Sequence, residues 1–264
     1  MNRLVRAVAQ RVPVVQRVLE ALRPEVEKPA VAPVLVPDLP VTPEILGRKA
    51  AYAHWGEDLV VSFLLSDKRN GFYVDVGCYH PTLYSNTQLL FEAGWRGVNI
   101  DPNPFMIEQF KVVRPNDINL NVAISDSDVS EIDYFIFNDW GSSNTASVRF
   151  AGEVCRNQNV AVQKSLRVPC ETLANIFAKH CAGVAVDFLN VDVEDLDMEV
   201  LRSNDWAKNR PTVVAVEDFQ FDFSEPQRSP IFAFLTSKHY NMVSRNIYSS
   251  VFVADESGIK LYQK

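Results

Sequence analysis

The 264-residue chain has room for one α/β domain of about 200 residues and a modest appendage. Apolar residues make up 47% of it and charged residues 22%, so the chain can bury a sizeable core and is not disordered by composition. The net charge is −7, but residues 1–30 carry six basic and three acidic side chains, which leaves −10 for the rest. Because phosphate binding depends on Lys and Arg, this acidic body argues against nucleic acid as a partner.

The four cysteines are spread along the chain, form no CxxC pair and have no zinc spacing with histidine. We therefore expect four reduced thiols in a cytoplasmic protein. No segment has the roughly 20 uninterrupted apolar residues of a membrane span. Arginines interrupt the apolar run at the N-terminus, which argues against a secretory signal. The protein is expected to be soluble, or peripheral at the inner face of a membrane.

Residues 1–23 place Leu and Val at helical spacing, with charged and polar residues largely opposite. This pattern predicts an amphipathic helix that is kinked or restarted at Pro13. A basic helix of this kind suits two roles: it binds an anionic membrane surface or a partner protein, or it docks on its own domain or on a dimer mate. Six prolines within residues 24–44 predict an extended linker, so the main domain is expected to cover residues 45–264.

From residue 45 onward, short apolar strands alternate with helical stretches, which is typical of a mostly parallel sheet with helices on both faces. Helices are predicted over residues 47–66, 84–93, 104–112, 171–180, 196–203 and 229–239. Strands are predicted over residues 71–77, 96–102, 118–125, 131–138, 186–193 and 211–219. Two final strands within 241–262 are expected to supply an antiparallel edge, and residues 139–165 are predicted to be irregular.

The first predicted strand ends in the run Asp75-Val76-Gly77-Cys78-Tyr79-His80. Ligands of open α/β sheets bind beyond the carboxyl ends of the strands. A glycine at this point lets the backbone approach a ligand closely, and Asp75 is placed to contact a cationic or hydroxylated group. The alternative is an ordinary strand-to-helix turn. The following Ser85-Asn86-Thr87 either caps a helix or contacts the same ligand.

The second predicted strand ends at Asp101-Pro102, and Asp101 follows Gly77 by 24 residues. An acidic side chain about 20 residues after a glycine turn is where nucleoside-binding folds hold ribose hydroxyls. The GxGxxG fingerprint is missing, since no glycine follows Gly77 before Gly94. A nucleoside without a pyrophosphate therefore fits better than NAD, and a nucleotide-dependent dehydrogenase is the disfavoured alternative.

Several ordered blocks of the chain resemble the FkbM family of S-adenosylmethionine-dependent methyltransferases. They cover residues 73–104 (YVDVGCYHPTLYSNTQLLFEAGWRGVNIDPNP), 114–125, 188–206 and 210–218, and the similarity extends over roughly residues 56–255. The resemblance implies a Rossmann-like class I methyltransferase fold with a seven-stranded, mostly parallel sheet. It also implies transfer of a methyl group to a hydroxyl of a sugar, a glycan or a related small molecule.

The resemblance further implies how S-adenosylmethionine is held. The loop that follows Asp75 would surround its methionine part, Asp101 its ribose, and residues 121–123 its adenine. The residues expected to contact the cofactor are Asp75, Gly77, Cys78, Tyr79, Asn86, Thr87, Asp101, Pro102, Asn121, Ala123 and Asp192.

One position departs from the family pattern, which is similar to Asp-Val-Glu-Gly after the fourth core strand. This chain has Asp192-Val193-Glu194-Asp195 instead. Asp tolerates a left-handed backbone, so we expect the turn to survive. The extra carboxylate would stand beside the acceptor site and crowd it, which keeps a second hypothesis open: a catalytically impaired, cofactor-binding scaffold or partner protein.

Methyl transfer from a sulfonium is an in-line displacement that needs alignment and removal of the acceptor proton. The candidate catalytic side chains are Asp192, Glu194, Glu217 and His80, each as a base, or the carboxylates as ligands of Mg²⁺ or Mn²⁺. We expect no metal, because the spacing shows no additional ligand. The structural alternatives are that Asp192 and Glu194 cap the helix near Leu196 and that His80 shapes its turn.

Two further predictions concern the surroundings of the site. The polar stretch 139–159 is predicted to be an acceptor-binding lid, because loops of that length are usually functional or disordered. Trp95 and Trp206 are predicted to pack in the core and not to serve as sugar platforms.

Overall fold

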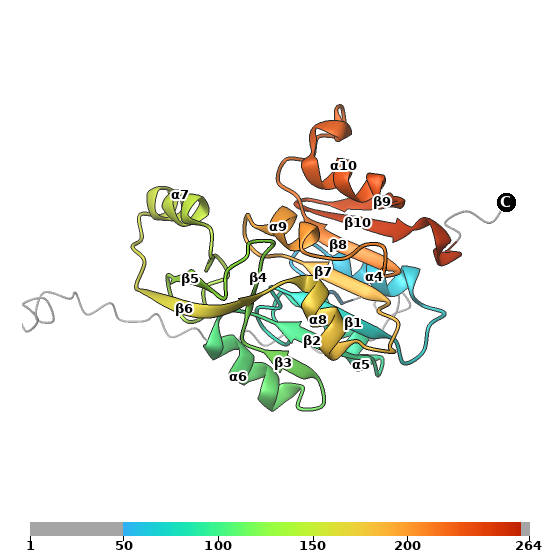
Figure 1. Ribbon diagram of the computed structural model, residues 1–264, viewed down its shortest axis with the longest axis horizontal. Coiled ribbons are helices and arrows are strands. Elements are labelled where there is room, and N and C mark those ends of the chain that lie inside the picture. The colour runs from blue at the N-terminus through green and yellow to red at the C-terminus, as the bar shows by residue number, and fades with distance from the viewer. Residues whose placement is uncertain (1–49, 260–264) are drawn as a thin grey trace, which may run out of the picture. The chain divides into compact units, whose positions relative to one another are not determined.

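The computed structural model describes residues 50–259 (Figure 1). The helix predicted over residues 1–23 and the linker over 24–44 lie outside these residues, as do both ends of the predicted main domain. The described residues all belong to one compact unit. Among the described residues, no helix is long and apolar enough to cross a membrane.

Helices and strands alternate through the described chain. The strands are β1 (Phe72–Val76), β2 (Arg96–Ile100), β3 (Ile118–Leu120), β4 (Ala123–Ile124), β5 (Glu131–Ile136), β6 (Lys164–Glu171), β7 (Phe188–Val191), β8 (Val213–Glu217), β9 (Tyr240–Asn246) and β10 (Ser249–Ala254). The helices are α4 (Glu57–Leu64), α5 (Gln88–Glu92), α6 (Pro104–Val113), α7 (Val148–Gln158), α8 (Leu173–His180), α9 (Asp197–Arg202) and α10 (Pro230–Ser237), with 3-10 turns η1 (Pro226–Arg228) and η2 (Asp255–Ser257).

Seven strands form one sheet in the order β3-β2-β1-β7-β8-β10-β9. Strands β3, β2, β1, β7 and β8 are parallel, and β10 runs antiparallel to both of its neighbours. The expected antiparallel edge is therefore confirmed. The chain proceeds outward from β1 through β2 to β3 and later returns to the other side of β1 as β7. This reversal of strand order is a topological switch point, where open α/β sheets bind their ligands.

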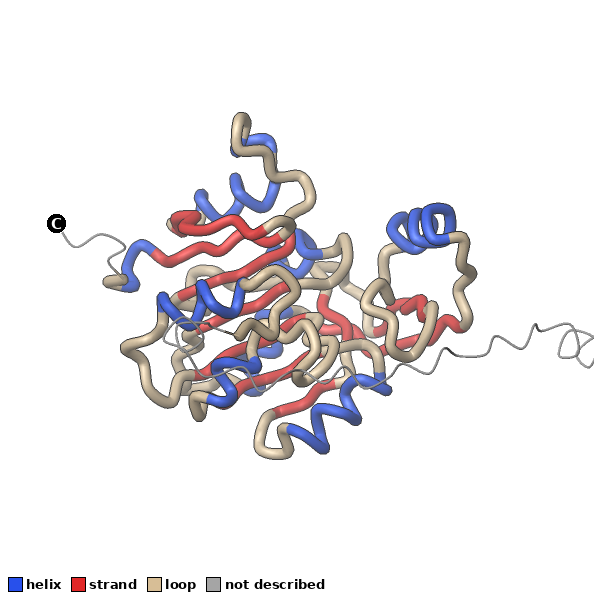
Figure 2. Tube along the Cα trace, turned by 180° about the vertical axis from the view of Figure 1, so that it is seen from behind, coloured by secondary structure: helices blue, strands red, loops and turns tan. Residues whose placement is uncertain are grey.

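The side chains of the parallel strands alternate between two hydrophobic clusters, as the period of two in a strand requires. Val74 and Val76 pack in one cluster with side chains of α8, α9 and α10. Tyr73 packs in the other with side chains of α4 and α5. Helices thus cover both faces of the sheet (Figures 1 and 2). Trp95 and Trp206 are buried, at 2% and 6% exposure, which confirms their predicted place in the core.

A second sheet of three strands, in the order β4-β6-β5, lies with α7 to one side of the first sheet (Figures 1 and 2). The single strand predicted over residues 118–125 is wrong: β3 pairs with β2, whereas β4 turns to pair with β6. The irregular stretch predicted over 139–165 is also wrong, because it contains α7 and the start of β6. Helix α7 does have an apolar face, made by Phe150, Ala151, Val154 and Cys155, but the helix is polar on average and stands within a polar stretch, which conceals this face in the sequence.

Two predicted helices begin later than expected. The helix predicted from residue 47 begins at Glu57, because Gly56 has a left-handed backbone with φ 83°. The helix predicted from residue 84 begins at Gln88, and its N-cap Thr87 makes no capping hydrogen bond with its side chain. Residues 84–87 are consequently loop, which leaves Tyr84 and Asn86 free to face the ligand side of the sheet.

Candidate functional site

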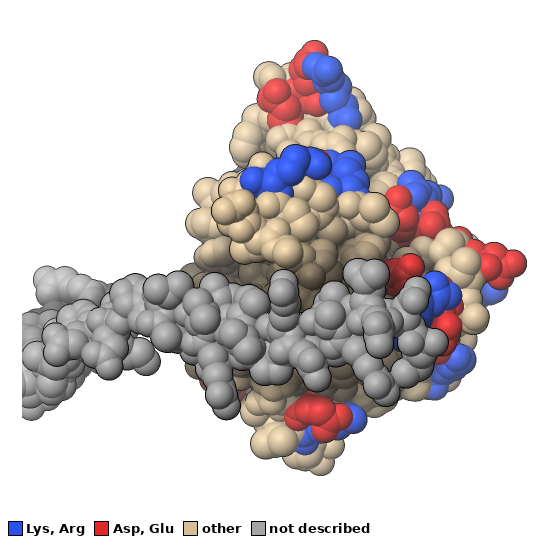
Figure 3. All heavy atoms as spheres, turned by 90° about the vertical axis from the view of Figure 1, so that its left-hand side faces the viewer, with Lys and Arg blue, Asp and Glu red and all other residues tan. Residues whose placement is uncertain are grey.

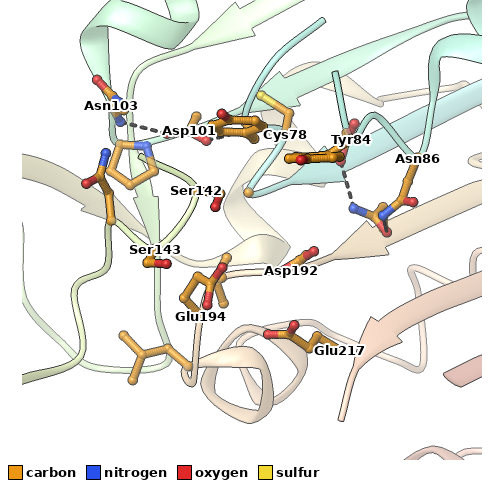
Figure 4. A pocket seen from close by; sticks show the side chains of 18 of the residues that line it. Cys78, Tyr84, Asn86, Asp101, Asn103, Ser142, Ser143, Asp192, Glu194 and Glu217 are labelled. Atoms are coloured by element: carbon orange, nitrogen blue, oxygen red, sulfur yellow. Dashed lines mark hydrogen bonds between the residues drawn. The ribbon is translucent and has the colours of Figure 1, made fainter. Parts of the chain in front are cut away.

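A cavity of about 270 Å³ lies at the carboxyl ends of β1, β2, β7 and β8 (Figure 4). It occupies the topological switch point, where the sequence places its candidate site. The predicted site residues that line it are Asp75, Gly77, Cys78, Tyr79, Asn86, Asp101, Pro102, Ala123, Asp192, Glu194 and Glu217. Three predicted residues, Thr87, Asn121 and His80, do not line it.

Gly77 is required by the backbone of the neighbouring strand. It has φ +78°, and a Cβ built there would lie 1.7 Å from the carbonyl oxygen of Asp192. Its N–H donates to the carbonyl of Ile100 at 2.9 Å. A side chain at this position would separate the ends of β1 and β7, so glycine is needed for the close approach of two strands that face the cavity.

Asp75 is fully buried and anchors a chain of hydrogen bonds behind the cavity. Its carboxylate accepts from the Thr87 hydroxyl at 2.8 Å and from the Asn190 amide at 2.9 Å. Asn190 in turn accepts from the amide nitrogen of Asn86 at 3.0 Å. This fixes the orientation of Asn86 and leaves its buried Oδ1 without a hydrogen-bond partner. Burial raises the pKa of Asp75, against the opposing hydrogen bonds from Thr87 and Asn190.

Arg114 holds the loop of residues 81–88 from the side away from the cavity. Its side chain is fully buried, and Nη1 donates to the Thr87 hydroxyl at 2.9 Å. Nη2 donates to Ser85 and Gln88 at 3.1 and 2.9 Å, and also to the Pro81 carbonyl. Thr87 therefore supports Asp75 and does not cap α5, while Ser85 supports Arg114.

Asp101 closes the end of the cavity next to β2. Its carboxylate accepts the backbone N–H groups of Tyr79 at 2.9 Å and Asn103 at 2.7 Å. Burial raises its pKa to about 7, and the hydrogen bonds from Asn103 and Tyr79 oppose that rise. Asn121 donates to the backbone carbonyl of Asp101 at 2.9 Å, so it positions the strand end from behind the cavity wall. Apolar side chains beside Asp101 complete this end, namely Pro102, Met106, Ala123 and Ile124.

The opposite side of the cavity is acidic. Asp192 follows β7, Glu217 ends β8, and Glu194 follows Asp192 by two residues; Figure 4 shows their carboxylates on the same side of the pocket. Burial raises the pKa of all three, and repulsion from neighbouring carboxylates adds to the rise. Glu217 has a buried oxygen, Oε2, without a hydrogen-bond partner. These groups hold protons at higher pH than ordinary carboxyls do, which suits proton transfer near neutral pH.

The helix-capping alternative for these carboxylates finds no contact in its favour. Helix α9 has Leu196 at its N-cap and no capping side chain. Asp197, inside the first turn, accepts the backbone N–H of Val193 at 3.1 Å. Asp192 and Glu194 instead line the cavity.

Asp195 does not crowd the cavity. It adopts the left-handed backbone that its family position calls for, with φ 90°, but its side chain is turned toward the start of α7. The carboxylate accepts from the Ser147 hydroxyl at 2.7 Å and forms an ion pair with Arg149. The expectation of an added charge at the acceptor site is therefore wrong, and the scaffold hypothesis loses the observation on which it rested.

His80 points into its own turn. Its Nδ1 accepts the backbone N–H groups of Leu83 at 2.9 Å and Thr82 at 3.1 Å. Burial lowers its pKa, so the neutral ring that these bonds require is favoured. The contacts agree with the turn-shaping alternative.

Part of the predicted lid lines the cavity. Residues 141–144 and Ala146 do so, whereas α7 does not. The loop is tied to the segments that follow β1 and β2, because the Tyr79 hydroxyl donates to the Trp140 carbonyl at 2.8 Å and the Asn103 amide to the Asp139 carbonyl at 3.0 Å. These residues form part of the cavity wall in this structure.

No group of three or more His, Cys, Asp or Glu side chains within residues 50–259 is arranged to hold a metal ion.

Sequence reasoning missed several residues that line the cavity, among them Trp55, Tyr84, Asn190, Phe219 and Tyr248. Asn190 had a signal, since it is a polar residue inside the apolar run of β7. Trp55 and Tyr84 were assigned to helices that begin only later in the chain. Phe219 and Tyr248 follow strand ends, where an aromatic side chain gives no sign of which way it faces.

The chain was also compared with known proteins. Neither the curated proteins nor the solved structures gave a match. The model of the Methyltransferase FkbM domain matches residues 75–242, from the carboxylate behind the glycine turn to strand β9. That span includes the end of β1 and all of β2, β7 and β8, whose ends form the cavity, and it covers more than half of the sequence. The chain therefore belongs to the FkbM methyltransferase family.

Proposed function

We propose that the protein transfers the methyl group of S-adenosylmethionine to a hydroxyl of a sugar, a glycan or a related small molecule. The observation that carries this proposal is that one cavity contains two kinds of acidic group. Asp101 stands at a strand end of the kind that holds ribose in nucleoside-binding folds, and Asp192 and Glu217 are carboxyls with raised pKa values. The strand order, with its switch point beside β1, supports the Rossmann-like class I fold implied by the sequence resemblance.

The residues present fit this cofactor. S-adenosylmethionine carries positive charge on its sulfonium and ammonium groups, and no Lys or Arg lines the described cavity, whereas six acidic residues do. The unpartnered Oδ1 of Asn86 is a buried acceptor at the cavity, suited to an ammonium or hydroxyl donor. Asp101 would hold the ribose, and the apolar side chains beside it would pack on the adenine.

When bound, S-adenosylmethionine supplies an electrophilic methyl group. Asp192 and Glu217 end adjacent strands, so an acceptor between them meets carboxylates from two sides. A deprotonated carboxylate accepts the hydroxyl proton as attack proceeds, and a protonated neighbour orients the same oxygen by hydrogen bonding. Asp192 stands next to the Gly77 turn and is the better placed of the two to act as the base.

Two measurements test the proposal. Calorimetry with S-adenosylhomocysteine should give saturable binding, while NADH under the same conditions should give none. Transfer of a labelled methyl group from S-adenosylmethionine to a mixture of neutral glycosides should then depend on Asp192. Binding of NADH in preference to S-adenosylhomocysteine would overturn the proposal.

A further inference from the structure

Three aromatic side chains form a wall at the acidic end of the cavity: Trp55, Phe219 and Tyr248, called the aromatic wall below. Tyr248 contacts both others, with ring centroids 5.7 Å from Trp55 and 5.2 Å from Phe219. All three line the cavity, yet they remain 41%, 50% and 43% exposed. Grouped exposed aromatics mark binding surfaces, because the free protein gains nothing by leaving them in water.

Hydrogen bonds hold the backbone that carries Trp55 and Tyr248. The backbone N–H of Trp55 donates to the Glu57 carboxylate at 3.0 Å, and the backbone carbonyl of Trp55 accepts from the Asn246 amide at 3.0 Å. The carbonyl of Tyr248 accepts from Asp218 at 2.7 Å. Residues far apart in sequence are thus fixed around one surface, and a preorganised surface loses less entropy on binding.

The wall continues toward the cofactor side through His54. Its ring stacks between Trp55 and Tyr84, with centroid distances of 4.3 and 4.4 Å. The row of rings therefore extends from Tyr84, in the loop after β1, to Phe219, which follows β8. Ser249, next to Tyr248, pairs with Glu217 across β8 and β10, which sets the wall directly beside this carboxylate.

The charges of the cavity restrict what can occupy this position. Six acidic residues line it, namely Glu57, Asp75, Asp101, Asp192, Glu194 and Glu217, and no basic side chain of the described residues does. A phosphate or carboxylate on the acceptor would find no basic partner in this lining, and any deprotonated carboxylate there would repel it. On the side of the molecule viewed in Figure 3, described charged residues of both signs occur in small groups with uncharged surface between them, so no broad basic patch is visible to offset this.

An uncharged sugar ring can bind to both the aromatic wall and the carboxylates beside it. Its C–H face is apolar and packs on aromatic rings, while its hydroxyls donate to carboxylates such as the unpartnered oxygen of Glu217. We propose that the aromatic wall is the acceptor subsite and that it binds an uncharged pyranose, with discrimination against acceptors that carry a phosphate or a carboxylate. This inference rests on the proposed methyltransferase function and specifies its acceptor.

The test measures binding of probe sugars to the full chain saturated with S-adenosylhomocysteine. The probes are the methyl glycosides of glucose, mannose, galactose and rhamnose, the methyl glycoside of glucuronic acid, and glucose 6-phosphate, titrated by ligand-observed NMR. At least one neutral glycoside should bind, and each anionic probe should bind about tenfold more weakly or worse, which corresponds to 1.4 kcal/mol.

Variants then assign the binding to the wall. Trp55→Ala and Phe219→Ala should each weaken the neutral glycoside by about tenfold or more, because buried aromatic contacts dominate such interfaces. Phe223→Ala is the matched control: Phe223 is 76% exposed and does not line the cavity, so this variant should bind as the unaltered chain does.

The outcomes separate this inference from the proposed function. Three outcomes overturn the aromatic wall as a subsite for uncharged sugars while S-adenosylhomocysteine binding stays intact. They are equal affinity for neutral and anionic probes, no sugar binding at all, and no effect of the wall variants. Loss of S-adenosylhomocysteine binding in the unaltered chain overturns the proposed function and the acceptor inference with it.

Discussion

The two sides of the cavity differ in how many hydrogen bonds their carboxylates accept from the protein. On the proposed cofactor side, Asp75 and Asp101 each accept two hydrogen bonds from the protein. On the acceptor side, Asp192, Glu194 and Glu217 receive none from the side chains of the described residues, and Glu217 has a buried unpartnered oxygen. The hydrogen bonds to Asp75 and Asp101 fix the positions of these side chains. The carboxylates on the other side keep their oxygen atoms available for a ligand.

The difference has an energetic meaning. A buried carboxylate with its hydrogen bonds made is tolerated, while one without partners costs stability. Substitutions on the cofactor side should therefore destabilise the fold, and substitutions on the acceptor side should stabilise it while removing function. Such a trade-off is the usual cost of an active site.

Loss of Arg114 should have the largest effect on stability. Arg114→Met removes the donor for Thr87, Ser85 and Gln88 and leaves their acceptors buried, which should lower the free energy of unfolding by about 3 to 5 kcal/mol. Urea denaturation measures this. Arg96→Met, at an exposed arginine, should change stability by about 0.5 kcal/mol at most. If both variants lowered the free energy of unfolding by similar amounts, Arg114 would not be the support of the loop of residues 81–88.

Asp192→Asn should reduce turnover by a factor of about 10² to 10⁴ if this residue is the base. Its binding of S-adenosylhomocysteine should stay nearly unchanged, because the proposed cofactor contacts lie around Asp101 and Asn86. Single-turnover methyl transfer with a bound acceptor gives the rate, and calorimetry gives the affinity. Near-normal turnover would remove Asp192 from the chemistry and direct attention to Glu217.

The pH dependence of stability should report the raised carboxyl pKa values. A carboxyl with a pKa of about 7 in the folded state, such as Asp101, binds a proton that the unfolded chain releases at about pH 4. Its contribution to stability is present below the unfolded pKa and is lost as pH rises through the folded pKa. The free energy of unfolding should consequently fall from about pH 5 to about pH 8.

Glu217→Gln should flatten that fall and stabilise the protein at about pH 8 by about 1 kcal/mol or more, since the amide carries no charge to bury. Glu225→Gln, at an exposed glutamate, is the control and should leave the pH profile unchanged. Urea denaturation across pH without ligand measures both. A destabilised Glu217→Gln variant would mean that the carboxylate has partners within the fold.

The same contrast explains which parts of the site the sequence predicts. Asp75, Gly77 and Asp101 follow apolar strands at fixed spacing, so their positions at the sheet edge are encoded locally. Trp55, Phe219 and Tyr248 meet only because three distant segments converge, and no local pattern reports such a meeting. Strand β4 likewise leaves the main sheet through pairing with β6, a long-range contact that the single apolar run over residues 118–125 does not reveal.

The smallest expected effect concerns Asp195, where the family pattern has glycine. The left-handed backbone at φ 90° disfavours any residue with a Cβ, by about 1 to 2 kcal/mol, while the hydrogen bond from Ser147 and the ion pair with Arg149 offset this. Asp195→Gly relieves the strain and loses the contacts, so its stability should lie within about 1 kcal/mol of the unaltered chain. Asp195→Ala loses the contacts and keeps the strain, so it should be less stable than Asp195→Gly by about 1 to 2 kcal/mol. Urea denaturation of the two variants isolates the backbone contribution, since both lack the carboxylate.

Methyl transfer should persist in both variants, because the Asp195 side chain is turned toward α7 and does not line the cavity. Equal stability of the Ala and Gly variants would show that the turn carries no strain, and loss of transfer in Asp195→Gly would show that the link to Arg149 holds the acceptor side in its working arrangement.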